Sequence, residues 1–136
     1  MTGITVTEDK EAAVEWFSKA ADQDFGPAQK DLGIACQLGE GTPKNYTHAV
    51  YWFRKASKLG LPEAHLHLGV AYANGEGVPT DFSLAYSWCF LAKLGGDPQA
   101  TDALKQIGGN LGWLERYKAG RLARRKFFSN EDFDKP

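Results

Sequence analysis

Apolar positions recur along most of the chain with the period of an α-helix. One such set falls at positions i, i+3, i+4 and i+7 and consists of Ala49, Trp52, Phe53 and Ala56. The same spacing occurs 36 residues earlier, around Trp16, and 36 residues later, around Trp88. No segment alternates with the two-residue period of a strand. The pattern therefore predicts an all-α protein.

Turn and capping residues divide this pattern into seven expected helices. They lie near residues 9–23, 27–38, 46–59, 62–74, 82–94, 98–108 and 112–127. Asp9, Asn45 and Asp81 each precede a helix in the same register, so we expect them to be N-caps. Pro62 and Pro98 are expected in a first helical turn, where proline's missing N–H costs little.

Much of the sequence repeats at an interval of 36 residues. The interval relates the tryptophans at 16, 52 and 88, the leucines at 32, 68 and 104, and the loops 39–43 and 75–79. A fixed period of this length is typical of a solenoid, in which each unit buries its apolar face against its neighbours. We expect an α/α superhelix of stacked antiparallel helix hairpins, with the tryptophans packed between helices. Truncating one of them should then cost about 3–5 kcal/mol.

The repeat register also predicts the domain organisation. Residues 1–136 form a single expected domain, with a partial repeat at 9–24, repeats at 25–60 and 61–96, and a degenerate C-terminal cap at 97–128. Arg124 stands where the register predicts a fourth tryptophan, so the last helix is interpreted as a capping helix. Gly69, beside Leu68, lowers helix propensity, and we expect a neighbouring helix to approach closely there.

One stretch resembles the Sel1-like repeat, a relative of the tetratricopeptide repeat. The matching residues are Ala64, Leu68-Gly69, Tyr72, Gly75-x-Gly77-Val78-Pro79, Asp81-Phe82, Ala85 and Trp88, and residues 28–56 repeat much of this pattern. The resemblance implies an α/α superhelix that acts as an adaptor in multiprotein complexes. Some cysteine-rich bacterial relatives are described as binding or hydrolysing β-lactams. Those relatives carry a cysteine pair in each repeat, which this chain lacks.

The related tetratricopeptide pattern implies a partner-binding groove on the concave face of the first helix of each repeat. The positions that match it, with two residues beside them, are Lys30, Asp31, Ile34, Leu38, Leu66, His67, Val70 and Asn74. This mixture is apolar with few charges, so it favours an extended peptide or a partner helix as the ligand. The alternative is that these side chains only line a solvated surface.

No residue pattern indicates catalysis, a cofactor or a metal. His65 and His67 lie about 200° apart around a helix, so they do not share a face. No serine lies in a nucleophile-elbow context, and the two Gly-Glu-Gly loops follow helices rather than strands. Cys36 and Cys89 occupy slots that hold aromatic residues in other repeats, so we interpret them as buried thiols rather than a disulfide.

Net charge and hydropathy also limit the kinds of partner that we expect. A net charge of −1 predicts no strong attraction to nucleic acid or to an anionic membrane, and no small-molecule substrate is expected. No apolar run approaches the roughly 18 residues that span a bilayer. The opening residues also lack a signal-peptide pattern. We expect a soluble protein, with a cytoplasmic location slightly favoured.

Residues 116–128 are rich in Arg and Lys. They are interpreted as the polar outer face of a cap, with an anionic-partner patch as the alternative. Phe127 and Phe128 either fold back onto Trp113 and Tyr117 or remain open as a docking point.

Three functions follow from these observations. The leading hypothesis is a non-enzymatic adaptor that binds a protein or peptide. The second is a β-lactam-handling enzyme. The third is self-association as a homodimer through the first helix, whose apolar residues have no preceding helix to cover them: Ala13, Trp16, Phe17 and Ala20.

Overall fold

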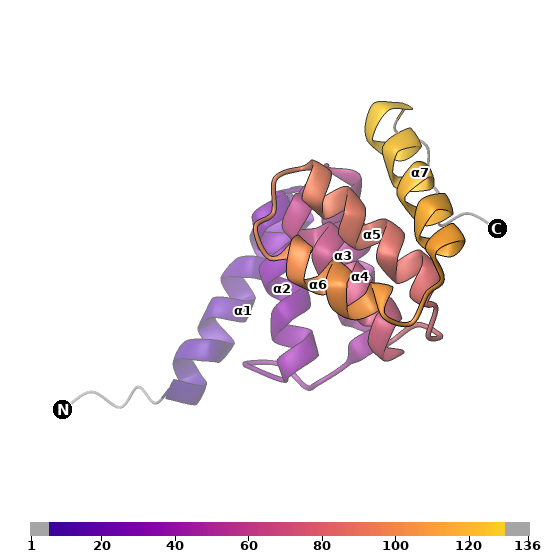
Figure 1. The fold of residues 1–136 in the computed structure, drawn as a ribbon. Helices are drawn as coiled ribbons and strands as arrows, with labels where there is room; N and C mark the ends of the chain where they lie inside the picture. Colours follow the sequence, from indigo (N-terminus) through magenta and orange to yellow (C-terminus); the bar gives the residue numbers. More distant parts are fainter. Residues whose placement is uncertain (1–5, 130–136) are drawn as a thin grey trace. The chain divides into compact units, whose positions relative to one another are not determined.

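Seven α-helices make up the computed structural model, which describes residues 6–129 (Figure 1). The helices are α1 (Val6–Asp22), α2 (Gly26–Leu38), α3 (Tyr46–Lys58), α4 (Pro62–Asn74), α5 (Phe82–Leu94), α6 (Ala100–Gly108) and α7 (Trp113–Ser129). No strand occurs among the described residues. The helices agree with those predicted from the periodicity, and the boundaries differ by at most three residues.

The chain forms two compact units, one ending at Leu61 and the other beginning at Pro62. In the first unit, α2 packs against both α1 and α3. The core of this unit is made mainly of small residues around the Phe53 ring, which is fully buried. The buried apolar residues are Ala21, Ala28, Leu32, Ala35, Cys36, Ala49, Val50, Phe53 and Ala56.

Helix α5 is the centre of the second unit, because it packs against α4, α6 and α7. It is buried on several sides and is mainly apolar. The α5 residues Ala85, Trp88 and Cys89 are all buried. The final helix, α7, packs on α5 through Ala119 and Ala123. The Ser87 hydroxyl donates to the Ala119 carbonyl at 3.1 Å and links the two helices.

Glycines allow the helices of each hairpin to approach closely. A Cβ at Gly33 on α2 would lie 2.6 Å from the Phe53 ring on α3. At the equivalent place in the second unit, a Cβ at Gly69 would meet the Cys89 sulfur and would lie 2.9 Å from the Ala85 carbonyl oxygen. The close approach predicted at Gly69 is therefore confirmed, and it occurs in both hairpins.

The helix ends follow the sequence signals in most places. Asn45 and Asp81 are N-caps, and their side chains accept hydrogen bonds from the backbone N–H groups of His48 and Leu84, both at 3.0 Å. The expectation for Asp9 was wrong, because α1 begins at Val6 and Asp9 lies inside the helix.

Two further positions show how the chain turns between helices. Pro98 was expected in a first helical turn but precedes α6, which begins at Ala100. After α1, Asp24 adopts a left-handed conformation with φ of 59°. Glycine occupies the equivalent positions after the later helices, with φ of 83° at Gly60 and 94° at Gly96.

The tryptophans do not share one environment, contrary to the prediction that all pack between helices. Trp88 is 2% exposed, whereas Trp16 is 71% exposed and Trp52 is half-buried. Trp16 lies on α1, whose main packing contact within the first unit is with α2. Equivalent register therefore does not give equivalent burial, because burial depends on how many helices surround the position.

Candidate functional site

The expected groove residues of the first unit lie on α2. Asp31 forms an ion pair with the neighbouring Lys30, with 3.2 Å between the Lys30 Nζ atom and the Asp31 Oδ1 atom. Both side chains are partly buried. Ile34 is half-buried, and Leu38 at the end of the helix is 57% exposed. Exposed apolar side chains next to a paired charge can contact a partner without leaving an unpaired charge buried.

Asp31 and Ile34 line a cavity of about 280 Å³ between α1 and α2. The α1 wall is apolar and contains Ala13, Val14 and Phe17. Lys10 and Glu40, also in the lining, form an ion pair at 3.5 Å. The cavity therefore combines an apolar wall with paired charges.

The expected groove residues of the second unit lie on α4. Leu66 is buried, with 7% of its surface exposed, whereas His67 and Val70 are half-buried. Asn74 is exposed, and its side-chain amide donates to the Glu76 carboxylate at 2.9 Å. Leu66 therefore contributes more to the core than to a surface.

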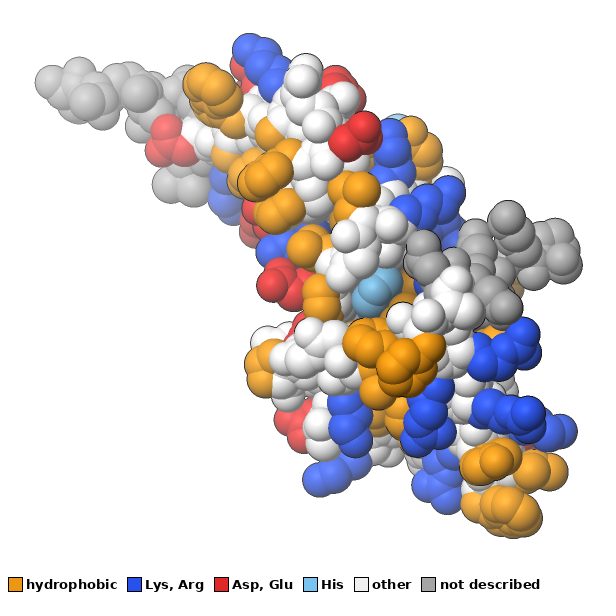
Figure 2. Space-filling view, turned by 90° about the horizontal axis from the view of Figure 1, so that it is seen from above, with side chains coloured by type: hydrophobic (Ala, Val, Ile, Leu, Met, Phe, Trp, Pro, Cys, Tyr) orange, Lys and Arg blue, Asp and Glu red, His pale blue; other side chains and the backbone are white. Residues whose placement is uncertain are grey.

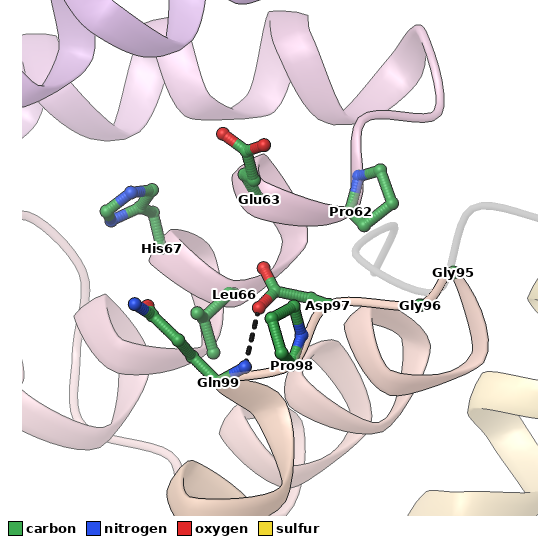
Figure 3. Close-up of a pocket in the computed structure, with 9 residues that line it drawn as sticks. All are labelled: Pro62, Glu63, Leu66, His67, Gly95, Gly96, Asp97, Pro98 and Gln99. Atoms are coloured by element: carbon green, nitrogen blue, oxygen red, sulfur yellow. Dashed lines mark hydrogen bonds between the residues drawn. The ribbon is translucent and has the colours of Figure 1, made fainter.

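Leu66 and His67 also border a cavity of about 400 Å³ at the start of α4 (Figure 3). Opposite them lies the loop that joins α5 to α6. The lining consists of Pro62, Glu63, Leu66, His67, Gly95, Gly96, Asp97, Pro98 and Gln99. In Figure 3, Leu66 points toward the part of the loop that carries Pro98 and Gln99.

Local hydrogen bonding and packing hold this loop. The Asp97 carboxylate accepts a hydrogen bond from the Gln99 backbone N–H at 2.8 Å. A Cβ at Gly95 would lie 2.7 Å from the Pro62 ring, so glycine lets the loop pass the start of α4. The cavity offers carboxylate, imidazole and amide groups around an apolar side chain, which suits polar and apolar contacts with a peptide better than covalent chemistry.

His65 lies in the core and not in this cavity. Its ring stacks on Trp88 with centroids 5.5 Å apart, and its Nδ1 atom is buried without a hydrogen-bond partner among the described residues. The pKa of His65 is lowered to about 4, mainly by burial and also by the positive charge of Lys126. The imidazole is therefore neutral near pH 7.

Both cysteines are buried free thiols, as the sequence predicted. Burial raises the pKa of Cys36. The pKa of Cys89 is raised to about 12, mainly by burial and also by the negative charge of Asp97. A thiol that stays protonated at neutral pH is a poor nucleophile, so neither cysteine suits covalent catalysis.

The sequence did not predict one surface that α5 and α7 form together. It contains Phe90, Trp113, Arg116, Tyr117, Gly120 and Arg124, which are among the residues lining a cavity of about 430 Å³, and we call it the aromatic–arginine surface. The Arg124 guanidinium lies over the Phe90 ring, 4.8 Å from its centroid. The spacing of the α7 residues could have revealed one shared stripe, but the packing of α5 beside them is a tertiary feature.

The two phenylalanines near the C-terminal end of α7 have solvent-exposed side chains. Phe127 is 46% exposed and Phe128 is 81% exposed, and their rings form an edge-to-face pair with centroids 5.3 Å apart. Of the two alternatives, the open arrangement is the one found. In Figure 2, exposed hydrophobic side chains likewise lie beside Lys and Arg side chains on the face in view.

No group of three or more His, Cys, Asp or Glu side chains is arranged to hold a metal ion within residues 6–129. In the same part of the chain, no helix has the length and apolar composition needed to cross a bilayer.

Several solved structures are similar to this chain, including the following two. One is c5321, a protective antigen present in uropathogenic Escherichia coli strains that displays an SLR fold, with 30% identity and a TM-score of 0.83 over 92% of this chain. The other is a Sel1 repeat protein from Oxalobacter formigenes, with 32% identity and a TM-score of 0.66 over 75% of this chain. This chain spans only 27% and 41% of their respective lengths. No curated protein matches the sequence significantly.

The family comparison agrees with the repeat pattern. The Sel1 repeat model matches residues 1–25, 26–61 and 62–97. Together with the structural neighbours, this match confirms the predicted all-α solenoid fold of helical hairpins. Sel1 repeat proteins typically mediate protein–protein interactions, and the fold is generally a non-catalytic scaffold. The chain belongs to the Sel1 repeat family.

Proposed function

We propose that this protein is an interaction module that binds a partner protein, through extended or helical segments, on the exposed side of α2 in the first unit and on that of α4 in the second. The observation that carries the proposal is the match of three consecutive segments to the Sel1 repeat, a family whose members typically bind proteins. The proposed contact residues are Lys30, Asp31, Ile34 and Leu38 on α2, and His67, Val70 and Asn74 on α4, whereas the buried Leu66 only borders the cavity beside them.

The surroundings of these residues support a binding role. Asp31 and Ile34 border the cavity on α1 and α2, and Leu66 and His67 border the cavity at the start of α4. Concave sites with apolar walls and a few polar groups are the usual form of a recognition surface. Each cavity can accept one or a few side chains of a peptide rather than a whole small-molecule substrate.

A peptide selection tests the proposal. The full chain is immobilised and panned against a random peptide library, and the selected peptide is labelled and titrated with protein while fluorescence anisotropy is followed. We expect Leu38→Glu and His67→Glu to weaken binding about tenfold, because a carboxylate would be placed in a partly apolar interface.

Tyr51→Glu is the matched control, since Tyr51 is 52% exposed on α3 and lies outside both cavities. Its affinity should equal that of the wild type. The proposed surface is excluded if Tyr51→Glu weakens binding as much as the other two variants, or if neither of them changes it. Far-UV circular dichroism confirms that each variant is folded. Leu66 is left unchanged because its burial would make a charged substitution unfold the unit.

Self-association is a second candidate, and one observation favours it. Trp16 on α1 is 71% exposed, and a large exposed aromatic side chain is suited to an interface. Sedimentation velocity over a range of protein concentrations tests this candidate. A dimer that Trp16→Ser dissociates supports it, and a monomer at every concentration rules it out.

A further inference from the structure

The α7 residues of the aromatic–arginine surface form one stripe along that helix, beside Phe90 of α5. Trp113, Arg116, Tyr117, Gly120 and Arg124 follow the spacing i, i+3, i+4, i+7 and i+11, which keeps them on one side of the helix. Trp113 is 74% exposed and Tyr117 is 58% exposed. Trp, Tyr and Arg are the residues that contribute most often to the energy of protein interfaces. This stripe therefore has the composition of a docking surface.

Gly120 opens the centre of the stripe. A Cβ at this position would lie 3.4 Å from the Phe90 ring, so glycine leaves the ring as the floor of the cavity. The cavity volume of about 430 Å³ is enough for one large apolar side chain of a ligand. The centre of the surface is thus suited to an apolar anchor.

The two arginines flank this centre. Among residues 6–129, neither Arg116 nor Arg124 forms a salt bridge with a carboxylate. The Arg124 guanidinium lies over the Phe90 ring, and this kind of contact leaves the N–H groups at the edge of a guanidinium able to donate hydrogen bonds. Arginine is suited to bidentate binding of a carboxylate.

The other cations of α7 do not extend this pair into a charged track. At about 100° per residue, Lys118 and Arg125 lie about 120–140° from the centre of the stripe, and Arg121 lies about 80° from it, outside the stripe. Lys118 lines a different cavity, with Ser83 and Leu84. Binding of nucleic acid usually uses cations that follow one groove along the backbone. Two arginines at either end of an aromatic floor fit a short peptide better.

We propose that the aromatic–arginine surface binds an extended acidic peptide of another protein, with two carboxylates four residues apart and an apolar or aromatic residue midway between them. Arg116 and Arg124 are eight residues apart, which corresponds to about 12 Å along the helix. Residues i and i+4 of an extended peptide are about 13 Å apart and point to the same side, as does residue i+2. The carboxylates meet the arginines, and the central side chain enters the cavity at Gly120, beside the edge of the Phe90 ring.

A pair of synthetic peptides of equal composition tests this spacing. The first contains Asp-Ser-Phe-Ser-Asp, and the second contains Asp-Ser-Phe-Asp-Ser, in which one carboxylate is moved to the opposite side. Each is labelled with fluorescein and titrated with the full chain at low ionic strength. We expect the first peptide to bind about fivefold to tenfold more tightly, because only it can engage both arginines.

Single substitutions on α7 locate the binding site. Arg116→Gln and Arg124→Gln should each weaken binding of the first peptide about fivefold to tenfold, to the level of the second. Arg121→Gln removes the same charge from an exposed position outside the stripe, and it should leave the affinity within about twofold of wild type. Trp113→Ala is a further variant at a highly exposed position, which keeps the test valid if Arg124→Gln disturbs the packing on Phe90.

Three results would overturn the proposal. One is equal affinity for the two peptides, and another is an equal loss of affinity in Arg121→Gln, since either would show binding by general charge. The third is tighter binding of a twelve-nucleotide oligo-dT than of the first peptide, weakened by the same Arg116 and Arg124 variants, which would identify a nucleic-acid surface. These results are distinct from a failure of the groove on α2 and α4, because the Leu38 and His67 variants leave this surface unchanged.

Discussion

Trp88 and His65 form a buried, stacked ring contact in the second unit. Trp88 is 2% exposed and His65 is 5% exposed, and their rings are stacked. Burying a large aromatic side chain removes apolar area from water, while burying an imidazole without a partner for Nδ1 costs free energy. The pair therefore joins a strongly stabilising residue to one that makes stability depend on pH.

Trp88→Ala should lower the free energy of unfolding by about 3–5 kcal/mol, because it leaves a large cavity at the centre of α5. Trp16→Ala removes the same side chain from an exposed site, and its effect should stay within about 0.5 kcal/mol. Urea unfolding followed by far-UV circular dichroism measures both values. Similar losses for the two variants would show that Trp16 is buried in solution.

His65 should make the protein less stable in acid. Its pKa is about 4 in the folded chain, whereas its ordinary value is 6.5. Between these two pH values His65 is therefore mostly protonated in the unfolded chain and mostly neutral in the folded chain. Stability from this group is fully present above pH 6.5 and is lost as the pH falls toward 4. The loss is about 3 kcal/mol at most.

Urea unfolding at several pH values, compared between the wild type and His65→Gln, isolates this effect. The wild type should lose more stability between pH 7 and pH 4 than His65→Gln does. His48→Gln, at an exposed position, is the control and should follow the wild-type profile. Parallel profiles for the wild type and His65→Gln would mean that folding does not lower the pKa of His65.

At the scale of the helices, the hairpins depend on close packing at glycine. Gly33 and Gly69 occupy the same register, and each lies against the second helix of its hairpin. The sequence predicted this approach at Gly69 from the low helix propensity of glycine beside a core leucine. It did not predict which atoms would be met, since a ring fills the space in one hairpin and a sulfur fills it in the other.

Gly69→Ala should destabilise the protein by about 1–2 kcal/mol. Alanine improves helix propensity by about 1 kcal/mol, but overpacking a core typically costs about 1–3 kcal/mol, and here the Cβ would approach both a sulfur and a backbone carbonyl. Gly120→Ala is the matched control within a helix, because its Cβ would lie at ordinary contact distance from Phe90. It should be neutral or stabilising in thermal unfolding. Stabilisation by Gly69→Ala would contradict the close packing of α4 on α5.

Helix α7 shows the limit of prediction at this scale. Its basic residues were interpreted as the polar face of a cap, and its aromatic residues were left as open alternatives. The structure places α7 against α5, so that Arg124 covers Phe90. Phe90 and Arg124 are 34 positions apart, and nothing in the local periodicity of either helix relates them.

At the scale of the whole molecule, contacts concentrate within two units. In the second unit, α5 meets α4, α6 and α7, and the buried core of these helices lies within residues 62–129. Repeat proteins gain stability from the contacts between neighbouring helices and do not need a single central core.

A chain of residues 62–136 should therefore fold without the preceding segment. We expect a helical far-UV circular dichroism spectrum and a cooperative urea transition, since the helices that surround Trp88 are all present. Introducing Trp88→Ala into this segment should abolish the transition or shift it to much lower urea. A spectrum without helical bands would show that the second unit requires the first.

The local sequence pattern predicts only in part which of the expected groove residues are exposed. The sequence placed eight residues on two helices, and in the structure Asp31 and Ile34 border one cavity while Leu66 and His67 border another. Leu66 was expected at a surface but is buried. Helical period identifies a face of a helix, whereas exposure depends on the loop that passes over it.

The sequence by itself determined the helices, their pairing into hairpins, the glycine contact at position 69 and the Sel1 repeat family, because all of these are repeated signals with a fixed helical period. Only the tertiary structure decided that Trp88 is buried while Trp16 is exposed, that His65 is neutral in the core, and that α5 and α7 combine into an aromatic–arginine surface. The physical reason is that period depends on neighbours along the chain, whereas burial, pKa and surface composition depend on neighbours in space.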